Sequence, residues 1–205
     1  MTDLWDHEGN ARAIYAEAGI DPSAPLGAHA LAWALCGARC IRYDWRPLFG
    51  DGCYEPPRGG RRETIWIRPK LTPEREAWVI FHELAERHLY EDHHHEEHER
   101  ACNELAARLR APREAFLPLV REVGFDPPRL ARAVRCSQTS AVLRFSEATG
   151  TPLALVSARS VRYRGEEWGW PPEPELRRLA RARTLPAEIR RVAITDAPRS
   201  AIVAA

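Results

Sequence analysis

Apolar residues recur at helical spacing over most of the chain, and short β-branched or aromatic runs stand between them. The spacing, the capping residues and the stops at glycine and proline predict a series of helices. These helices span residues 8–18, 25–35, 72–90, 96–110, 113–123, 129–133, 139–148 and 175–183. Strands are expected at residues 40–45, 64–67, 153–161 and 192–203. Residues 49–62 are rich in glycine and proline and are expected to form a loop, so the pattern predicts an α+β fold that is mainly helical, with a small antiparallel sheet.

The chain has 205 residues, which fits one ordinary domain or a larger domain with a small appendage. We expect one domain over residues 1–125 and a C-terminal extension of helices, with a short β or loop tail, over residues 126–205. Within the extension, residues 128–145 resemble a helix-turn-helix, with the turn at Cys136 and Ser137. Plain structural helices that pack the core are the alternative, and we prefer that interpretation.

Composition excludes several classes of protein. Lys and Arg total 30 against 29 Asp and Glu, so the charge gives little support for DNA binding and none for a membrane surface. No apolar run approaches the roughly 20 residues that span a bilayer, and the acidic N-terminus has no signal-peptide core. The five cysteines are scattered, which is typical of reduced thiols in a cytoplasmic protein. Cys36, Cys40 and Cys53 fit no common zinc spacing.

Metal-ligand residue types gather in one part of the chain. Six of the eight histidines lie between His82 and His98, and ten carboxylates lie between Glu74 and Glu104. His82 and Glu83 stand where a zincin helix has its first histidine and its catalytic glutamate. Position i+4 from His82 shares its helical face and holds Glu86, a residue type that can also bind zinc. A simple His82–Glu86 side-chain pair at the edge of a helix explains this spacing equally well.

The next helix offers a third ligand. Glu99, Cys102, Ala106 and Leu109 recur at i, i+3, i+7 and i+10, so Glu99 stands at the top of an apolar face that packs on another helix. The alternative is a solvated glutamate in the first turn, where the helix dipole favours it. The histidines at positions 93–95 are typical of a solvated turn, and His95 is the best further ligand among them.

Two segments resemble the ImmA/IrrE family of zinc metallopeptidases. Residues 64–75, followed by Phe81-His-Glu-Leu-Ala85, are similar to the family's strand, turn and active-site helix, and residues 99–112 are similar to its second motif. The resemblance implies a zincin-like metallopeptidase fold. It also implies that His82 and Glu99 are metal ligands and that Glu83 is the general base. Glu86 occupies the place of the family's second histidine.

The resemblance also implies the function. We expect a zinc-dependent metallo-endopeptidase whose partner is a protein substrate, such as a helix-turn-helix transcriptional repressor. A shell of one histidine and two carboxylates is harder than the usual one, so Mn²⁺ or Fe²⁺ competes with Zn²⁺. The alternative is a non-enzymatic regulatory protein of the same fold, which Glu86 favours and Glu83 disfavours. The sequence does not identify the oxyanion stabiliser, for which Tyr43 and Tyr54 are candidates.

Overall fold

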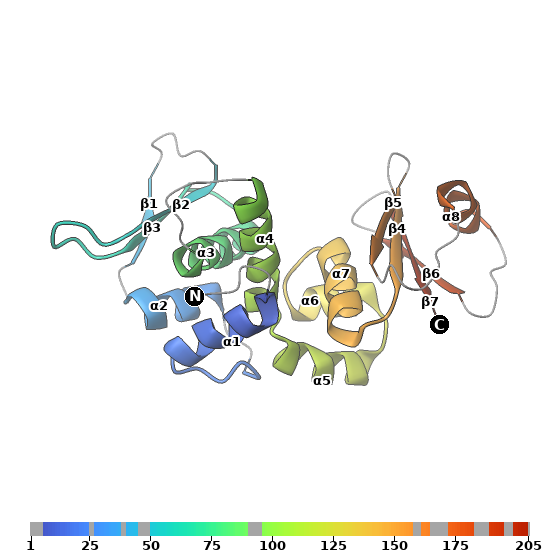
Figure 1. Ribbon diagram of the computed structural model, residues 1–205, viewed down its shortest axis with the longest axis horizontal. Helices are drawn as coiled ribbons and strands as arrows, with labels where there is room; N and C mark the ends of the chain where they lie inside the picture. The colour runs from blue at the N-terminus through green and yellow to red at the C-terminus, as the bar shows by residue number, and fades with distance from the viewer. Residues whose placement is uncertain are drawn as a thin grey trace. The chain divides into compact units, whose positions relative to one another are not determined.

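The chain folds into two compact units, Met1–Phe116 and Leu117–Ala205, in a computed structural model (Figure 1). The structure describes residues 6–24, 27–37, 40–44, 50–89, 96–157, 161–164, 172–182, 189–194 and 199–204. The expected α+β class, mainly helical, is confirmed. The place where a metallopeptidase domain ends, expected at residue 125, stays a prediction. None of the described helices is long and apolar enough to cross a membrane.

The first unit is built from helices around a three-stranded sheet. Its elements are α1 (His7–Glu17), α2 (Ala28–Cys36), β1 (Ile41–Tyr43), β2 (Gly52–Glu55), β3 (Thr64–Ile67), α3 (Pro73–His88) and α4 (Glu96–Arg110). Helix α5 (Arg113–Val123) carries the chain from the first unit into the second. The helix boundaries agree with the expected ones to within a few residues.

The sheet of the first unit differs from expectation in two ways. Strand β3 lies in the middle, antiparallel to β2 and parallel to β1, so the sheet is mixed and not purely antiparallel. Strand β2 lies within residues 49–62, which were expected to form a loop. The four residues of β2 stand among glycines and prolines. A strand this short gives no detectable alternation of apolar and polar residues.

Helix α3 forms the centre of the first unit. The Thr72 side chain caps it by accepting the Arg75 N–H at 3.3 Å, and Pro73 occupies the first turn. The helix packs on α4, on α2, and on strands β2 and β3 (Figure 1). Its buried side chains meet those of β3 and α4 in one apolar core; among them are Val79, Ile80, Phe81, Leu84, Ile65, Ile67, Cys102, Leu105 and Leu109. This core fixes α3 and α4 against each other.

After α5, the described part of the second unit contains three helices and a four-stranded antiparallel sheet. Its elements are α6 (Pro127–Ala133), α7 (Gln138–Thr149), β4 (Leu153–Ser157), β5 (Val161–Arg164), α8 (Glu173–Leu179), β6 (Ile189–Ile194) and β7 (Arg199–Ala204). The sheet has the order β5-β4-β7-β6. The runs expected as single strands at 153–161 and 192–203 each contain parts of two strands.

Candidate metal site

Helices α3 and α4 bring His82, Glu86 and Glu99 together. The Nε2 atom of His82 lies 3.4 Å from Glu86 Oε1 and 3.6 Å from Glu99 Oε2. One nitrogen and two carboxylate oxygens from the three residues all lie within 4.8 Å of one another. His82 and Glu86 follow each other by one turn of α3, and Glu99 comes from the first turn of α4. The convergence expected from the two apolar faces is therefore present.

These spacings suit a small divalent ion. Ligands at about 2.1 Å from a tetrahedral zinc ion stand roughly 3.4 Å apart, which is close to the two distances from the His82 nitrogen. The side chains of His82 and Glu86 are 15% and 16% exposed, whereas that of Glu99 is 50% exposed. A site with two shielded ligands and one at the surface leaves an open side. The donor set of one imidazole and two carboxylates fits zinc, and it also fits manganese or iron.

Glu83 lies beside this group and is buried, with 4% of its surface exposed. Burial raises the pKa of Glu83 well above its usual value and the charge of Glu86 raises it further, while the backbone N–H of Tyr54 lowers it. The Oε2 atom of Glu83 has no hydrogen-bond partner among the described residues. Because a buried carboxylate oxygen without a partner is costly, this atom is suited to bind a water molecule or a substrate group.

A cavity of about 270 Å³ opens over the three candidate ligands and Glu83. Strand β2 and the segment before it contribute Asp51 and Gly52, α3 contributes Arg75 and Trp78, and α4 contributes Asn103. Asp51 accepts a hydrogen bond from Arg75 Nε at 2.8 Å and lies 3.2 Å from Arg68 Nη1. The cavity lining therefore combines the carboxylates of the site with one arginine, Arg75, which pairs with Asp51.

Other residues that the sequence singled out do not belong to this group. His98 is buried and its Nε2 is 3.4 Å from Cys102 Sγ, whereas His88 lies near Glu17 and Arg87. The histidines at positions 93–95 lie outside the described residues. All five cysteines are free, and among the described residues His82, Glu86 and Glu99 form the group with metal-ligand spacing.

The two tyrosines considered as oxyanion stabilisers are engaged elsewhere. Tyr43 donates its hydroxyl to Glu76 at 2.8 Å, and Tyr54 donates its hydroxyl to Glu63 at 3.0 Å. Neither is among the residues that line the cavity. Tyr54 instead donates its backbone N–H to Glu83. The sequence could not predict this contact, because every residue except proline carries a backbone N–H.

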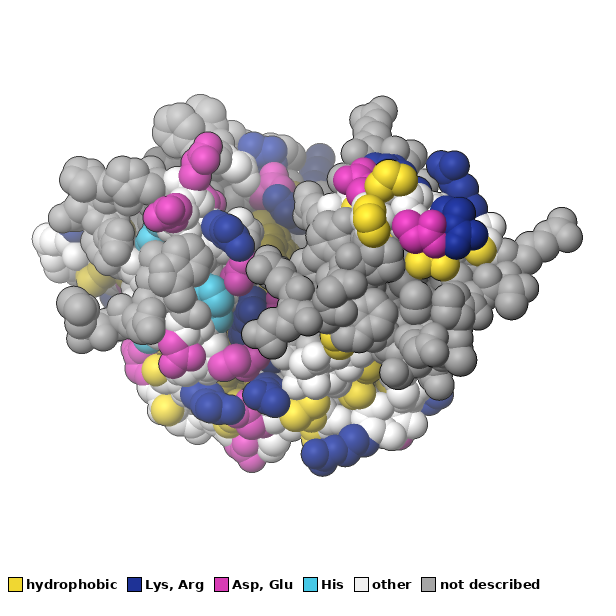
Figure 2. Space-filling view, turned by 45° about the vertical axis from the view of Figure 1, so that its right-hand side comes forward, with side chains coloured by type: hydrophobic (Ala, Val, Ile, Leu, Met, Phe, Trp, Pro, Cys, Tyr) yellow, Lys and Arg dark blue, Asp and Glu magenta, His cyan; other side chains and the backbone are white. Residues whose placement is uncertain are grey.

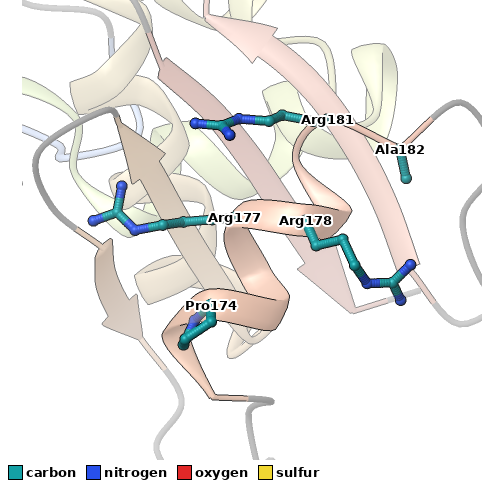
Figure 3. Close-up of a pocket in the computed structure, with 5 residues that line it drawn as sticks. All are labelled: Pro174, Arg177, Arg178, Arg181 and Ala182. Atoms are coloured by element: carbon teal, nitrogen blue, oxygen red, sulfur yellow. The ribbon is translucent and has the colours of Figure 1, made fainter.

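A second cavity, of about 420 Å³, lies beside α8 in the other unit (Figure 3). In Figure 3, Arg177 and Arg181 point to one side of the helix and Arg178 points to the other. Arg177 pairs with Glu173 and Arg178 pairs with Glu175, and Figure 2 shows basic and acidic side chains side by side on α8. Two of the three arginines are thus paired along their own helix, and this cavity offers no convergent set of chemical groups.

The comparison with known families points to a metallopeptidase-like domain. In a comparison with known families, residues 49–146 match the Peptidase M78 family, described as the IrrE N-terminal-like domain, so this part of the chain is similar to an ImmA/IrrE-like domain. The match comprises just under half of the chain. No curated protein sequence matches.

A solved structure titled Mycobacterium tuberculosis transcriptional regulator is similar in fold. Its TM-score is 0.56 at 17% sequence identity, and the match covers 78% of this chain and 54% of that one. At this identity the similarity shows the fold alone. This chain spans about half the length of that structure.

Proposed function

We propose that this protein is a metal-dependent endopeptidase, with zinc as the expected ion. The observation that carries the proposal is the placement of His82, Glu86 and Glu99 at ligand spacing beside the unpartnered oxygen of Glu83. A plain pair between His82 and Glu86 explains one of these contacts, but it explains neither the approach of Glu99 nor the burial of a second glutamate. The family match supports the same chemistry.

In this proposal each residue has a distinct task. His82, Glu86 and Glu99 hold the ion, and their mutual distances require little movement for binding. A bound divalent ion would polarise the scissile carbonyl and lower the pKa of the attacking water. Glu83 accepts the proton from that water on its free oxygen and later passes it to the leaving amine. A raised pKa suits both steps, because a strongly acidic carboxyl accepts a proton poorly.

The substrate that we propose is a regulatory protein such as a helix-turn-helix transcriptional repressor. The ImmA/IrrE-like family supports this class of substrate. A cavity with an open side and a polar rim suits a peptide segment that is exposed on a larger protein. The competing hypothesis is a regulatory protein without activity, and the residue that favours it is Glu86.

Replacement of Glu83 tests the proposal. Glu83→Gln keeps the size of the side chain but removes the base, so cleavage of a purified helix-turn-helix repressor should fall by about a hundredfold or more. The variant should retain the metal content and the melting temperature of the wild type. Glu97→Gln is the matched control, because Glu97 is exposed on α4 and does not line the cavity. Equal cleavage by wild type and Glu83→Gln would show that the general base has been assigned wrongly.

A further inference from the structure

Strand β2 runs so close to the Glu83 carboxylate that position 52 has no room for a side chain. A Cβ atom on Gly52 would lie 2.6 Å from Glu83 Oε1 and would also collide with Val79 Cγ1. Even alanine must therefore displace both of these side chains. The φ angle of Gly52 is not in the positive region, so the glycine is required for space and not for its backbone conformation.

The same strand also binds the carboxylate. The backbone N–H of Tyr54, two residues beyond Gly52, donates a hydrogen bond to Glu83. Both contacts come from the four residues of β2, at one edge of the three-stranded sheet. The pairing of β2 with β3, in which Gly52 lies opposite Ile67 and Tyr54 opposite Ile65, fixes the strand in place. Since Ile65 and Ile67 are fully buried, β2 is anchored to the core of the unit.

Strand β2 lies against one oxygen of the Glu83 carboxyl group, and the other oxygen has no hydrogen-bond partner among the described residues. Oε1 lies against the backbone of β2, whereas Oε2 is buried without a partner. A longer distance between β2 and α3 would let the side chain of Glu83 rotate and would lengthen the bond from Tyr54. The absence of a side chain at position 52 is therefore what permits this orientation of the carboxylate.

We propose that Gly52 is a positioning residue for Glu83: its missing side chain lets β2 hold Glu83 with one oxygen on the strand and the other directed to the reacting water. This inference rests on the proposed peptidase function, because it concerns the proton transfer that Glu83 performs there. Gly52 itself touches no reacting atom. We expect its effect on the reaction to pass through the placement of the carboxylate.

Val79 makes it possible to separate this role from ordinary packing. Gly52→Ala creates two collisions, one with the apolar Val79 and one with Glu83. Gly52→Ala/Val79→Ala removes the first collision and leaves the second. If Gly52 served packing alone, stability and cleavage would recover together in the double variant. If Gly52 positions Glu83, stability recovers and cleavage does not.

The experiment compares the wild type with both variants, using zinc content, melting temperature and cleavage of a purified helix-turn-helix repressor. In Gly52→Ala, zinc content should stay at the wild-type level and KM should stay within about twofold, while kcat falls by about ten- to a hundredfold. In the double variant the melting temperature should rise again with kcat still low. Cleavage by Gly52→Ala at the wild-type rate, or joint recovery of stability and kcat, overturns the proposal.

Gly27→Ala is the control for adding one methyl group at a glycine. A Cβ atom on Gly27 meets no described atom within 4 Å, and the residue lies at the start of α2, away from the cavity. This change should leave zinc content and cleavage as in the wild type. If Gly52→Ala fails to fold, the double variant carries the test, since its collision with Val79 is gone.

A second measurement does not depend on cleavage. The amide resonance of Tyr54 in the metal-free protein reports its hydrogen bond to Glu83, so it should move in Gly52→Ala and in Glu83→Ala, and stay in place in Gly27→Ala. An unmoved Tyr54 resonance in Gly52→Ala overturns the proposal. If the wild type cleaves no repressor, the proposed function fails, and the Tyr54 resonance alone then decides whether Gly52 sets the position of Glu83.

Discussion

Glu86 determines the charge of the candidate site. In a helix with two histidines at i and i+4, the ion keeps more of its positive charge, because both ligands are neutral. Here Glu86 Oε1 lies 3.4 Å from the His82 nitrogen, so the oxygen occupies the place where a second imidazole would bind. With Glu99 the shell carries two negative charges, which offset the charge of a divalent ion. The residue at position 86 therefore influences both which metal binds and how active the site is.

Glu86→His tests this assignment. The change replaces an anionic oxygen with a neutral nitrogen at the same helical spacing, so zinc should bind at least as tightly as in the wild type. A more positive ion acidifies its water more strongly, and cleavage of the repressor should hold or rise. If zinc binds and cleavage is absent in both proteins, the chain is a regulatory protein that has lost activity. Loss of zinc in Glu86→His, measured by elemental analysis, contradicts the assignment of Glu86 as a ligand.

At the scale of elements, the sequence predicted the helices that carry the site better than the strand that holds Glu83. Thr72 and Pro73 mark the start of α3, and the apolar spacing on α4 placed Glu99 toward its neighbour. Residues His82, Glu86 and Glu99 could be named because their types and spacing are chemical signals. Strand β2 contributes a missing side chain and a backbone N–H, neither of which depends on a recognisable residue pattern.

Helix α1 is held on α4 by side-chain contacts of His7 and Tyr15. His7 Nε2 lies 3.2 Å from Glu104 Oε2, Arg100 and Arg108 stand beside the same carboxylate, and the Tyr15 hydroxyl donates to the Leu109 carbonyl at 2.8 Å. The hydrogen bond with His7, followed by the charge of Arg108, lowers the pKa of Glu104 from 4.5 to about 2. Because α4 carries Glu99, the attachment of α1 also supports the site.

The lowered pKa predicts acid sensitivity. A depressed carboxyl pKa contributes stability above the unfolded value near 4.5, and that stability disappears as the pH falls from 4.5 towards 2. Glu104→Gln should therefore cost about 1–2 kcal/mol of unfolding free energy at pH 7, after allowance for solvent screening, and its stability should fall less steeply below pH 4.5. Urea titrations at several pH values measure both effects. If the free energy of unfolding depends on pH in the same way in Glu104→Gln and in the wild type, the ionised Glu104 carboxylate does not stabilise the fold.

The near-neutral net charge of the whole chain is the sum of two units whose net charges have opposite signs. Residues 1–116 contain 15 basic and 20 acidic residues, a net charge of −5, whereas residues 117–205 contain 15 basic and 9 acidic residues, a net charge of +6. The balance over the chain therefore does not argue against polyanion binding by the second unit. Arg129, Arg132 and Arg135 recur at three-residue intervals and are exposed, and none forms an ion pair with a described residue, whereas Arg144 is buried.

We therefore expect the second unit to carry whatever affinity the chain has for duplex DNA. If the three exposed arginines each contact one phosphate, the slope of log K against log salt should be about −3, at roughly 0.9 per phosphate. Arg129→Ala/Arg132→Ala/Arg135→Ala should remove that slope, as measured by fluorescence anisotropy with a labelled duplex. Arg177→Ala/Arg178→Ala is the control, because both side chains already pair with glutamates. Equal binding by the triple variant and the wild type would exclude this surface.

The metal content of the purified protein tests the central claim most directly. Protein purified without added metal, then reconstituted with Zn²⁺, Mn²⁺ or Fe²⁺ and freed of excess ion, is analysed beside His82→Ala. The geometry of His82, Glu86 and Glu99 predicts about one equivalent of one divalent metal in the wild type, most of it lost in His82→Ala. Less than about a tenth of an equivalent of any transition metal in the reconstituted wild type would contradict the account.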